Sequence, residues 1–368
     1  MIADRSILSI SPFPAAPLFH GAIARIHYLN AGLAASNRLV FVYRGEPNGA
    51  PPGFPCAAIP NSRYRPLQIF NPLLVLKLWR LTGARQIDLI VSNHIWSGLH
   101  GAVLATITGK PFLFDNHNVE FLRIRRMSRP FWPLIWLLEW AICQAADKVL
   151  CVSETDRHRL IHQLRVKPGK IDVVPNGVDV AGCVAKRVDS ARLRGSIGLA
   201  QTETLALFFG TLDYLPNATA AEIIVHEIAP RLERLDSAIR VIIAGRCSSP
   251  GWVSALERLS ERVSFVGFVD DIAAYIKSAD VVIVPLTMGS GTRFKILESV
   301  GCGRRVVSTT IGAEGLNRDA LGDSLVVHDD WDAFARAIVE TAKQPPLAPS
   351  VDFVQRYDWR HIVDRLQL

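Results

Sequence analysis

The chain has 368 residues, of which 49% are hydrophobic and 20% charged, and its formal net charge is +7. This length exceeds what one hydrophobic core usually serves, so we expect two domains. The composition is typical of a soluble globular protein, and no apolar run reaches the roughly 20 residues of a membrane-spanning helix. The first residues lack the pattern of a signal peptide, so we expect a cytoplasmic protein.

The charge is unevenly distributed along the chain. Residues 1–175 contain 20 Lys and Arg against 10 Asp and Glu, a net of +10, and the remainder contains 21 against 24, a net of −3. A basic amino-terminal half indicates an anionic partner. We find no nucleic-acid-binding motif and expect no such partner. The six cysteines are scattered without a CxxC pair, so we expect reduced thiols and no metal site.

Strand-like segments alternate with helical ones from end to end, which predicts a doubly wound parallel α/β architecture. The first series is SILSI, RLVFVYR, IDLIVSN, PFLFDNH, KVLCVS and IDVVPN. The second series is LALFFG, AIRVIIAG, VSFVGF, DVVIVPL, RRVVSTT and SLVVHD.

The rhythm stops at VPNGVDV, near the middle of the chain, where Pro-Asn-Gly has the chemistry of a turn. We therefore predict Rossmann-like domains at residues 1–177 and 178–347. The breaker QPPLAPS precedes an amphipathic helical segment, and we expect residues 348–368 to cross back toward the first domain. Two such domains facing one another create a ligand cleft at the carboxyl ends of both sheets.

A glycine-rich turn followed by basic residues lies at residues 288–310, MGSGTRFKILESVGCGRRVVSTT. It joins a buried strand to a helix, and the exposed amides and helix dipole favour an anion there. Arg293 adds a rigid fork of donors and Lys295 a point charge, while the Glu298 carboxylate can accept bonds from sugar hydroxyls. Lys295 and Glu298 are equally spaced for an i,i+3 surface pair, worth a few tenths of a kcal/mol.

Two turns in the first half also follow strand-like segments. FDNHNVEF (114–121) places His117 at a sheet's carboxyl edge. In residues 11–26 a helix begins near Gly21, where a glycine lets the backbone approach a phosphate. No GxGxxG fingerprint is present. A structural histidine and a helix start without a ligand are the alternatives.

Two matching turns lie in the second half. FFGTLDYLPNATAAE (208–222) has Gly210 and Thr211 at a strand end, and FVGFVDD (265–271) has Phe268 and Val269. A base could stack or bond to backbone at the second turn. Each turn alone is weak evidence for a ligand site, and we expect the turns together to line one cleft.

The segment PLTMGSGTRFKILESVGCGRRVVSTTIGAEGL resembles the carboxyl-terminal signature of the family-four retaining glycosyltransferases. GTLDYLPN, ADVVIVPL, VPNGVDV, ADKVLCVSETDRHRL and the loop around His117 fit the same family, so the resemblance covers nearly the whole chain. It implies the GT-B fold, two Rossmann-like domains facing across a cleft. It also implies transfer of a sugar from a nucleotide-diphosphate donor, UDP- or GDP-linked, with retention and without a metal or separate cofactor.

The resemblance implies that the second domain holds the donor and the first the acceptor. His117 matches the cleft histidine beside the reacting sugar, Glu298 the ribose-binding second glutamate of E-x7-E, and Gly21 a phosphate-contacting loop. His117 and Glu298 are the catalytic candidates. The donor-binding candidates are Gly21, Gly210, Thr211, Phe268, Val269, Ser290, Gly291, Thr292, Arg293, Lys295, Ile296, Leu297 and Glu298.

Two departures from the family pattern bear on the site. Ser290 stands where the first glutamate of E-x7-E belongs, which puts the identity of the sugar in doubt. The turn after LALFFG lacks the Arg and Lys that hold the pyrophosphate in relatives. We expect Arg293 and Lys295 to supply that charge.

The favoured function is a hexosyltransferase of polysaccharide or lipopolysaccharide biosynthesis, acting on a lipid-linked or glycan acceptor. A nucleotide-sugar epimerase and a catalytically inactive GT-B partner subunit are the alternatives. The stretch FLRIRRMSRPFWPLIWLLEW (121–140) combines arginines with tryptophans and leucines, as interfacial helices do. It predicts peripheral contact with an anionic membrane, on its inner face. A basic rim for a soluble anionic acceptor is the alternative interpretation.

Overall fold

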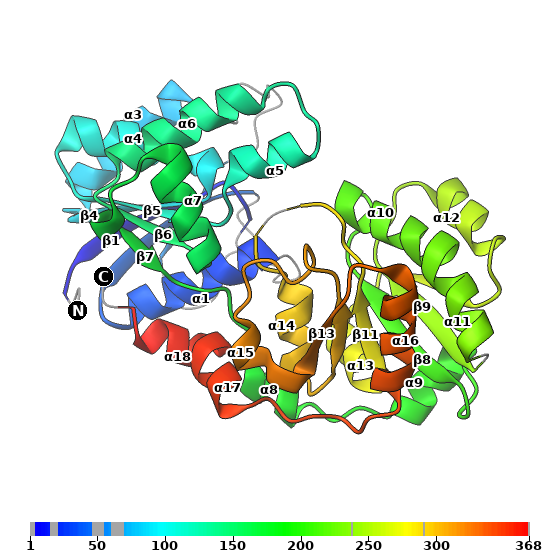
Figure 1. Ribbon diagram of the computed structural model, residues 1–368. Helices are drawn as coiled ribbons and strands as arrows, with labels where there is room; N and C mark the ends of the chain where they lie inside the picture. The colour runs from blue at the N-terminus through cyan, green and yellow to red at the C-terminus, as the bar shows by residue number, and fades with distance from the viewer. Residues whose placement is uncertain are drawn as a thin grey trace. The chain divides into compact units, whose positions relative to one another are not determined.

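The computed structural model describes residues 4–14, 21–45, 55–59, 70–236, 238–289 and 291–366. The chain forms two compact units (Figure 1): unit 1 contains residues 1–176 and 359–368, and unit 2 contains residues 177–358. The sequence-based boundaries were 177/178 and 347/348. In the structure, helix α17 (Val351–Tyr357) still belongs to unit 2, and the chain returns to unit 1 at Trp359.

Unit 1 is built on a parallel sheet of seven strands in the order β3-β2-β1-β4-β5-β6-β7. Its three central strands, β1, β4 and β5, are buried along their whole length, as expected of a parallel sheet covered on both faces. Strand β3 has no counterpart among the predicted segments. The strands are β1 (Ser6–Ser11), β2 (Arg38–Arg44), β3 (Cys56–Ile59), β4 (Leu89–Asn93), β5 (Phe112–Asn116), β6 (Lys148–Cys151) and β7 (Ile171–Val173).

Helices cover both faces of this sheet. Helix α1 and the carboxyl-terminal α18 pack together on one side, where the rings of Tyr28 and Trp359 stack 5.0 Å apart. Helices α3, α4, α6 and α7 form the opposite layer, in which each packs against the next (Figure 1). The bounds are α1 (Gly21–Ala35), α3 (Pro72–Ala84), α4 (Ile95–Thr108), α5 (Glu120–Arg126), α6 (Trp132–Ala145), α7 (Glu154–Leu164), η2 (Pro168–Lys170) and α18 (Trp359–Asp364).

Unit 2 is built on a parallel sheet in the order β10-β9-β8-β11-β12-β13. The four consecutive hydrophobic residues of β11 are completely buried and form the centre of its core. The strands are β8 (Thr204–Phe209), β9 (Ile239–Ala244), β10 (Val263–Gly267), β11 (Val281–Val284), β12 (Val306–Ser308) and β13 (Leu325–Val327).

The helices of unit 2 include the candidate ligand-binding helix α14 (Phe294–Gly301) and α10 (Leu215–Ile223), which follow β11 and β8. Helix α17 is held to this unit because Tyr357 accepts a hydrogen bond from Val178 N, at 2.8 Å. The other helices are α8 (Val180–Ala185), α9 (Ser190–Ser196), η3 (Ile224–Ile228), α11 (Ala229–Leu235), α12 (Pro250–Glu257), α13 (Ile272–Ser278), α15 (Arg318–Leu321), η4 (Gly322–Ser324) and α16 (Trp331–Ala342).

Within the described ranges, no helix is both long and apolar enough to cross a membrane. The largely apolar helix α6, WPLIWLLEWAICQA, has 14 residues.

Candidate active site

The predicted site residues lie at the carboxyl edges of the two sheets, where parallel α/β folds bind ligands. In unit 1, Gly21 is the first residue of α1, which follows β1, and His117 follows the last residue of β5. The remaining candidates belong to unit 2. Ser290 lies outside the described residues.

A row of glycines follows three neighbouring strands of unit 2. Gly210, Gly245 and Gly267 lie at the ends of β8, β9 and β10, and their backbones are linked: Gly245 N donates to Gly267 O at 2.7 Å. A Cβ atom on Gly245 would lie 2.0 Å from the carbonyl oxygen of Gly210. A side chain is therefore excluded at Gly245, and the ends of β8, β9 and β10 carry no side chain at these three positions.

Lys295 reaches this edge from helix α14. Its Nζ donates to Asn217 Oδ1 at 2.9 Å and lies 4.2 Å from the centre of the Phe208 ring. Asn217 in turn donates to Thr211 O at 2.9 Å. A Cβ atom on Gly210, whose φ is +145°, would lie 3.1 Å from Lys295 Nζ. The structure thus brings together three predicted residues, Gly210, Thr211 and Lys295.

Burial perturbs both titratable groups of α14. Desolvation, with a smaller contribution from Arg293, lowers the pKa of Lys295 to about 7. Desolvation raises the pKa of Glu298 to about 7, and Lys295 only partly offsets this. Both residues are half-buried, and Lys295 Nζ donates to Asn217 rather than pairing with Glu298, so the two side chains are not the solvated surface pair that their spacing also allowed. Strongly shifted groups at a strand edge are typical of functional sites.

Arg293 lies at the N-cap of α14, is 9% exposed, and turns back toward the glycine-rich segment. Its Nη2 atom is 3.5 Å from Met288 O, and a Cβ on Gly289 would lie 2.7 Å from that same nitrogen. Arg293 therefore contacts the turn after β11, whereas Lys295 contacts residues around the turn after β8. Gly291 and Thr292, which precede Arg293, are buried.

The remaining donor-binding candidates of unit 2 differ in what they offer. The side chains of Ile296 and Leu297 are completely buried in the hydrophobic core, and their main-chain N–H groups donate to Arg293 O. Phe268 directly follows β10 and is 57% exposed, while Val269 is half-buried.

In unit 1, His117 belongs to a buried polar cluster at the end of β5. Its Nε2 atom lies 2.9 Å from Asp115 Oδ2, and its ring meets that of His94 edge to face, with centroids 5.3 Å apart. Arg25 of α1 pairs with Asp115 through Nε and Nη2, the shortest contact being 2.6 Å. Burial alone would raise the pKa of Asp115, but Arg25 and His117 outweigh it and hold the pKa well below its usual range.

Sequence reasoning missed four residues of these clusters: Arg25, Asp115, Asn217 and Gly245. Gly245 ends AIRVIIAG as Gly210 ends LALFFG, and this repeated strand-glycine ending was a usable signal. Asp115 precedes His117 by two residues at the same strand end. For Asn217, nothing in the sequence marked its contact with Lys295, 78 positions away.

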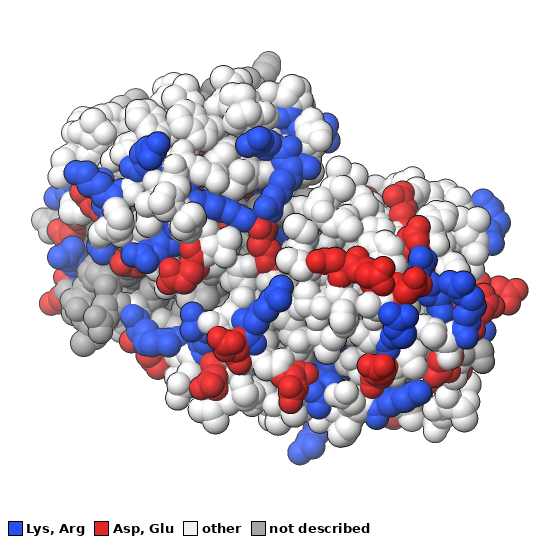
Figure 2. Space-filling view, viewed as in Figure 1, with Lys and Arg blue, Asp and Glu red and all other residues white. Residues whose placement is uncertain are grey.

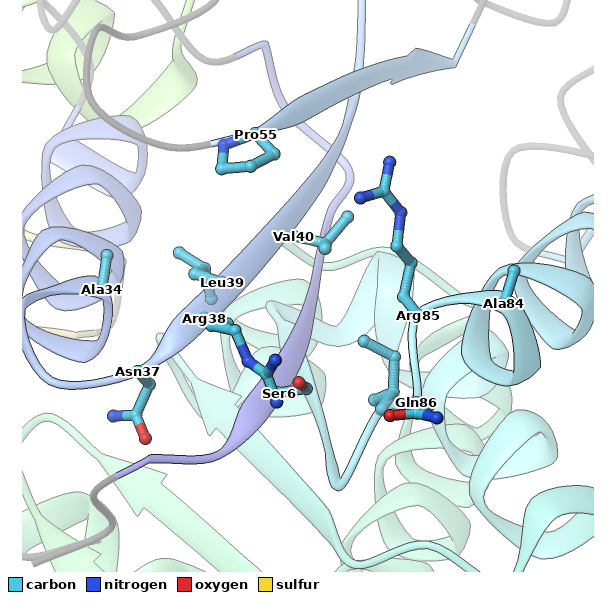
Figure 3. Close-up of a pocket in the computed structure, with 11 residues that line it drawn as sticks. Ser6, Ala34, Asn37, Arg38, Leu39, Val40, Pro55, Ala84, Arg85 and Gln86 are labelled. Atoms are coloured by element: carbon cyan, nitrogen blue, oxygen red, sulfur yellow. The ribbon is translucent and has the colours of Figure 1, made fainter.

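A pocket of about 460 Å³ in unit 1 lies elsewhere (Figure 3). It is lined by the amino-terminal ends of β1 and β2, including Ser6 and Arg38, and by Arg85 and Gln86 before β4. Because the strands are parallel, these residues lie at the edge opposite His117. The pocket is therefore not part of the predicted site.

Comparison with protein families identifies the chain. The profile described as "Glycosyl transferases group 1" matches residues 203–344, and the profile described as "Glycosyltransferase Family 4" matches residues 20–181. The chain belongs to these glycosyltransferases. This result confirms the family indicated by the motifs.

Characterised relatives of this glycosyltransferase are distant. The D-inositol 3-phosphate glycosyltransferase of Mycolicibacterium gilvum is 25% identical over 295 residues, covering 75% of this chain and 64% of its own length. The UDP-Gal:alpha-D-GlcNAc-diphosphoundecaprenol alpha-1,3-galactosyltransferase of Escherichia coli is 25% identical over 276 residues, covering 72% and 69%. The alignment thus spans slightly less than two thirds of the first relative.

Solved structures confirm the fold of this glycosyltransferase. The HepE protein of Anabaena, crystallised with UDP and glucose, superposes with a TM-score of 0.73 at 18% identity, covering 98% of each chain. The two-domain α/β architecture of the GT-B type is therefore confirmed.

Proposed function

We propose that the protein is a retaining, metal-independent hexosyltransferase that moves a sugar from a UDP- or GDP-linked donor to a lipid-linked or polysaccharide acceptor. Unit 2 holds the donor and unit 1 the acceptor. The observation that carries this proposal is the position of Lys295 Nζ beside Gly210, where a basic side chain reaches a strand end that has no side chain of its own.

The edge of the unit 2 sheet supports a division of roles along the donor. We assign the base to Phe268, which follows β10 and is 57% exposed, and the pyrophosphate to Lys295 and Gly210, which follows β8 two strands away. Two strand spacings amount to about 10 Å, a span suited to a nucleoside followed by its phosphates. Glu298, one turn after Lys295 on α14, accepts hydrogen bonds from the ribose. No separate cofactor is required.

The comparisons support the substrate classes. HepE, which shares the fold, was crystallised with UDP and glucose, and the E. coli relative carries in its name a UDP-linked donor and a diphosphoundecaprenol-linked acceptor. A role in cell-surface polysaccharide or lipopolysaccharide biosynthesis follows from an acceptor of this kind.

A thermal-shift screen tests the donor class. The purified protein is heated with UDP, GDP and their common sugars, and a ligand at 100 times its dissociation constant should stabilise the fold by about 2.7 kcal/mol. Stabilisation by one nucleotide and its sugars supports the proposal. If no nucleotide raises the melting temperature, the result would instead favour a catalytically inactive partner subunit.

We also propose that unit 1 docks on an anionic membrane through α3 and α6, on the inner face. Both helices flank α4 and expose large apolar side chains at helical spacing. Those residues are Leu73, Leu76 and Trp79 of α3, and Phe131, Leu134, Leu137 and Trp140 at and along α6. Contiguous exposed apolar surface of this kind is typical of interaction sites.

The charges around this apolar face fit an anionic surface. Helix α3 contributes exposed Lys77 and Arg80 and no acidic residue. The acidic residues of α5 and α6, Glu120 and Glu139, are buried, while Arg125 is exposed beside the Trp132 ring at 5.2 Å. In Figure 2 the surface over α4 and α6 is mostly white, with blue residues along its border. Basic residues near an apolar face add attraction to anionic lipids.

Liposome flotation with matched leucine variants tests this docking. Leu134→Glu, on the proposed face, should abolish binding to vesicles containing anionic lipid, because a carboxylate replaces a side chain that is 69% exposed. Leu259→Glu, in unit 2 and 60% exposed, is the matched control and should float like the parent. Equal binding by both variants, or binding that ignores anionic lipid content, would favour a basic rim for a soluble acceptor.

A further inference from the structure

The environment of His117 contains more than a histidine at a strand end. His117 is 4% exposed and Asp115 1%, so their contact of 2.9 Å between Nε2 and Oδ2 is shielded from water. Neither ring nitrogen of His117 makes a hydrogen bond of full geometry to a described residue, and Nε2 is the nitrogen that lies against the carboxylate. The negative charge beside Nε2 gives the two nitrogens of the imidazole different environments.

Arg25 holds the carboxylate of Asp115 from the opposite side. Its Nε lies 3.0 and 3.1 Å from the two carboxylate oxygens, and its Nη2 donates to Oδ1 at 2.6 Å. This is the bidentate geometry in which a guanidinium fixes both the position and the plane of a carboxylate.

Arg25 is itself fixed by the end of the first unit. Its Nη1 donates to Val174 O at 2.8 Å and to Asn176 Oδ1 at 3.1 Å, in the segment that follows β7. Arg25 is 1% exposed and lies one helical turn after Gly21. Three separate elements, α1, β5 and the segment after β7, therefore determine where the Asp115 carboxylate lies.

We propose that Asp115, clamped by Arg25, is a positioning residue that fixes His117 with Nε2–H directed at Asp115 and Nδ1 directed at the substrate. In its neutral form His117 then donates from Nε2, and its Nδ1 lone pair accepts a hydrogen bond from a hydroxyl of the reacting sugar. The neighbouring carboxylate selects this tautomer, because the alternative would place the Nε2 lone pair against a negative oxygen. The inference rests on the proposed function, which places His117 beside the sugar.

Nitrogen NMR of the free protein tests the orientation without any substrate. With 15N-labelled histidine, and His117 assigned by its loss in His117→Gln, the parent should show a protonated Nε2 and an unprotonated Nδ1 when His117 is neutral. Asp115→Asn should change this tautomer population, because an amide can present either a donor or an acceptor. A parent protein protonated at Nδ1 would overturn the proposal.

Asp147→Asn is the matched control. Asp147 Oδ2 accepts from Phe112 N at 2.9 Å, so it caps the amino end of the same strand, β5, that carries Asp115 at its carboxyl end. This variant loses a carboxylate on β5 without touching the histidine. It should keep the parental tautomer and turnover.

Turnover provides the second readout, measured as UDP release from UDP-glucose or GDP release from GDP-sugars. Asp115→Asn should lower kcat by about 100-fold or more, as loss of the correct tautomer does in other histidine-carboxylate pairs, while the dissociation constant for the nucleotide stays within about threefold. If the parent neither binds nor turns over any nucleotide sugar, the proposed function fails, whereas the NMR result still decides the orientation of His117.

Asp115→Asn leaves the Arg25 charge buried, which could prevent folding. The double variant Arg25→Met/Asp115→Asn removes both charges and restores the balance. It should fold and remain as slow as Asp115→Asn, with the same altered tautomer. Recovery of parental kcat in the double variant would show that Asp115 serves only to neutralise Arg25, and would overturn the positioning role.

Discussion

Lys295 Nζ lies 2.9 Å from Oδ1 of Asn217, so a side chain of helix α14 reaches the turn after strand β8. In this family that turn carries its own basic residues, and here it reads Gly210-Thr211-Leu212-Asp213 without any. The contact brings a basic side chain from the neighbouring strand-helix unit to this turn. We propose that Lys295 holds the phosphates, whereas Arg293 lies with the turn after β11.

Lys295→Met should weaken binding of the nucleoside diphosphate about 10- to 150-fold and leave the nucleoside nearly unaffected. The estimate follows from the 1.5–3 kcal/mol of a charge-assisted hydrogen bond. Calorimetric titration with UDP and uridine, or GDP and guanosine, measures both. Lys277→Met is the control, because Lys277 donates only to the carbonyls of Val184 and Lys186 in the same unit. Equal losses for nucleoside and diphosphate would place Lys295 outside the phosphate site.

Binding of the diphosphate at pH 8 should take up protons. Lys295, whose pKa is lowered to about 7 by burial, is mostly neutral at pH 8, and an adjacent phosphate raises its pKa and protonates it. Glu298, with a pKa of about 7, is already mostly ionised at that pH and contributes little. Calorimetry in two buffers of different ionisation enthalpy measures the uptake, which Lys295→Met should abolish. Proton release at pH 8 would contradict this assignment.

Local patterns in the sequence predicted most of the fold and part of the site. Alternating strands and helices indicated both sheets, and glycines at strand ends indicated the edge at Gly210. Strand β3 was not predicted, because its four residues CAAI are short and carry little periodicity. Their positions after predicted strands made His117 and Glu298 candidates, and the motif resemblance implied their catalytic roles, which stay predictions.

Contacts across the sheets could not be predicted, because they depend on strand order. Lys295 approaches Gly210 since β8 and β11 are neighbours, although 71 residues separate the end of β8 from the start of β11. Arg25 and Asp115 are 90 positions apart and pair because α1 covers the β5 end. The sequence around Arg25, GAIARIHYL, is largely apolar and does not indicate which carboxylate pairs with the arginine.

Gly245→Ala should destabilise the protein by about 1–3 kcal/mol, the usual cost of overpacking. The new Cβ would lie 2.0 Å from the carbonyl oxygen of Gly210, and a backbone atom yields less easily than a flexible side chain. Gly251→Ala is the control, because nothing lies within 4 Å of its Cβ position in helix α12, and it should be neutral or stabilising. Urea unfolding compares the two. Equal unfolding free energies for the two variants would show that the backbone around Gly245 accommodates the new methyl group without strain.

Arg293→Ala should weaken binding of the nucleoside diphosphate more than binding of the nucleoside if the guanidinium also reaches the phosphates. A loss of about 10- to 150-fold is expected for one charge-assisted bond. Arg293→Lys should recover only part, because an ammonium cannot reproduce the bidentate fork. Glu298→Gln should instead cost affinity for nucleoside and diphosphate alike, since its proposed partner is the ribose.

Titration of these three variants with nucleoside, monophosphate and diphosphate separates the roles. The contact between Arg293 Nη2 and Met288 O, at 3.5 Å, gives the arginine a second function, because it orders the glycine-rich turn. Loss of that order would lower the affinity for every ligand, so Arg293→Lys would then also bind the nucleoside more weakly than the parent does. If Arg293→Ala binds the diphosphate as tightly as the parent, then of these two residues Lys295 alone binds the phosphates, and Arg293 contributes only to the structure of the turn.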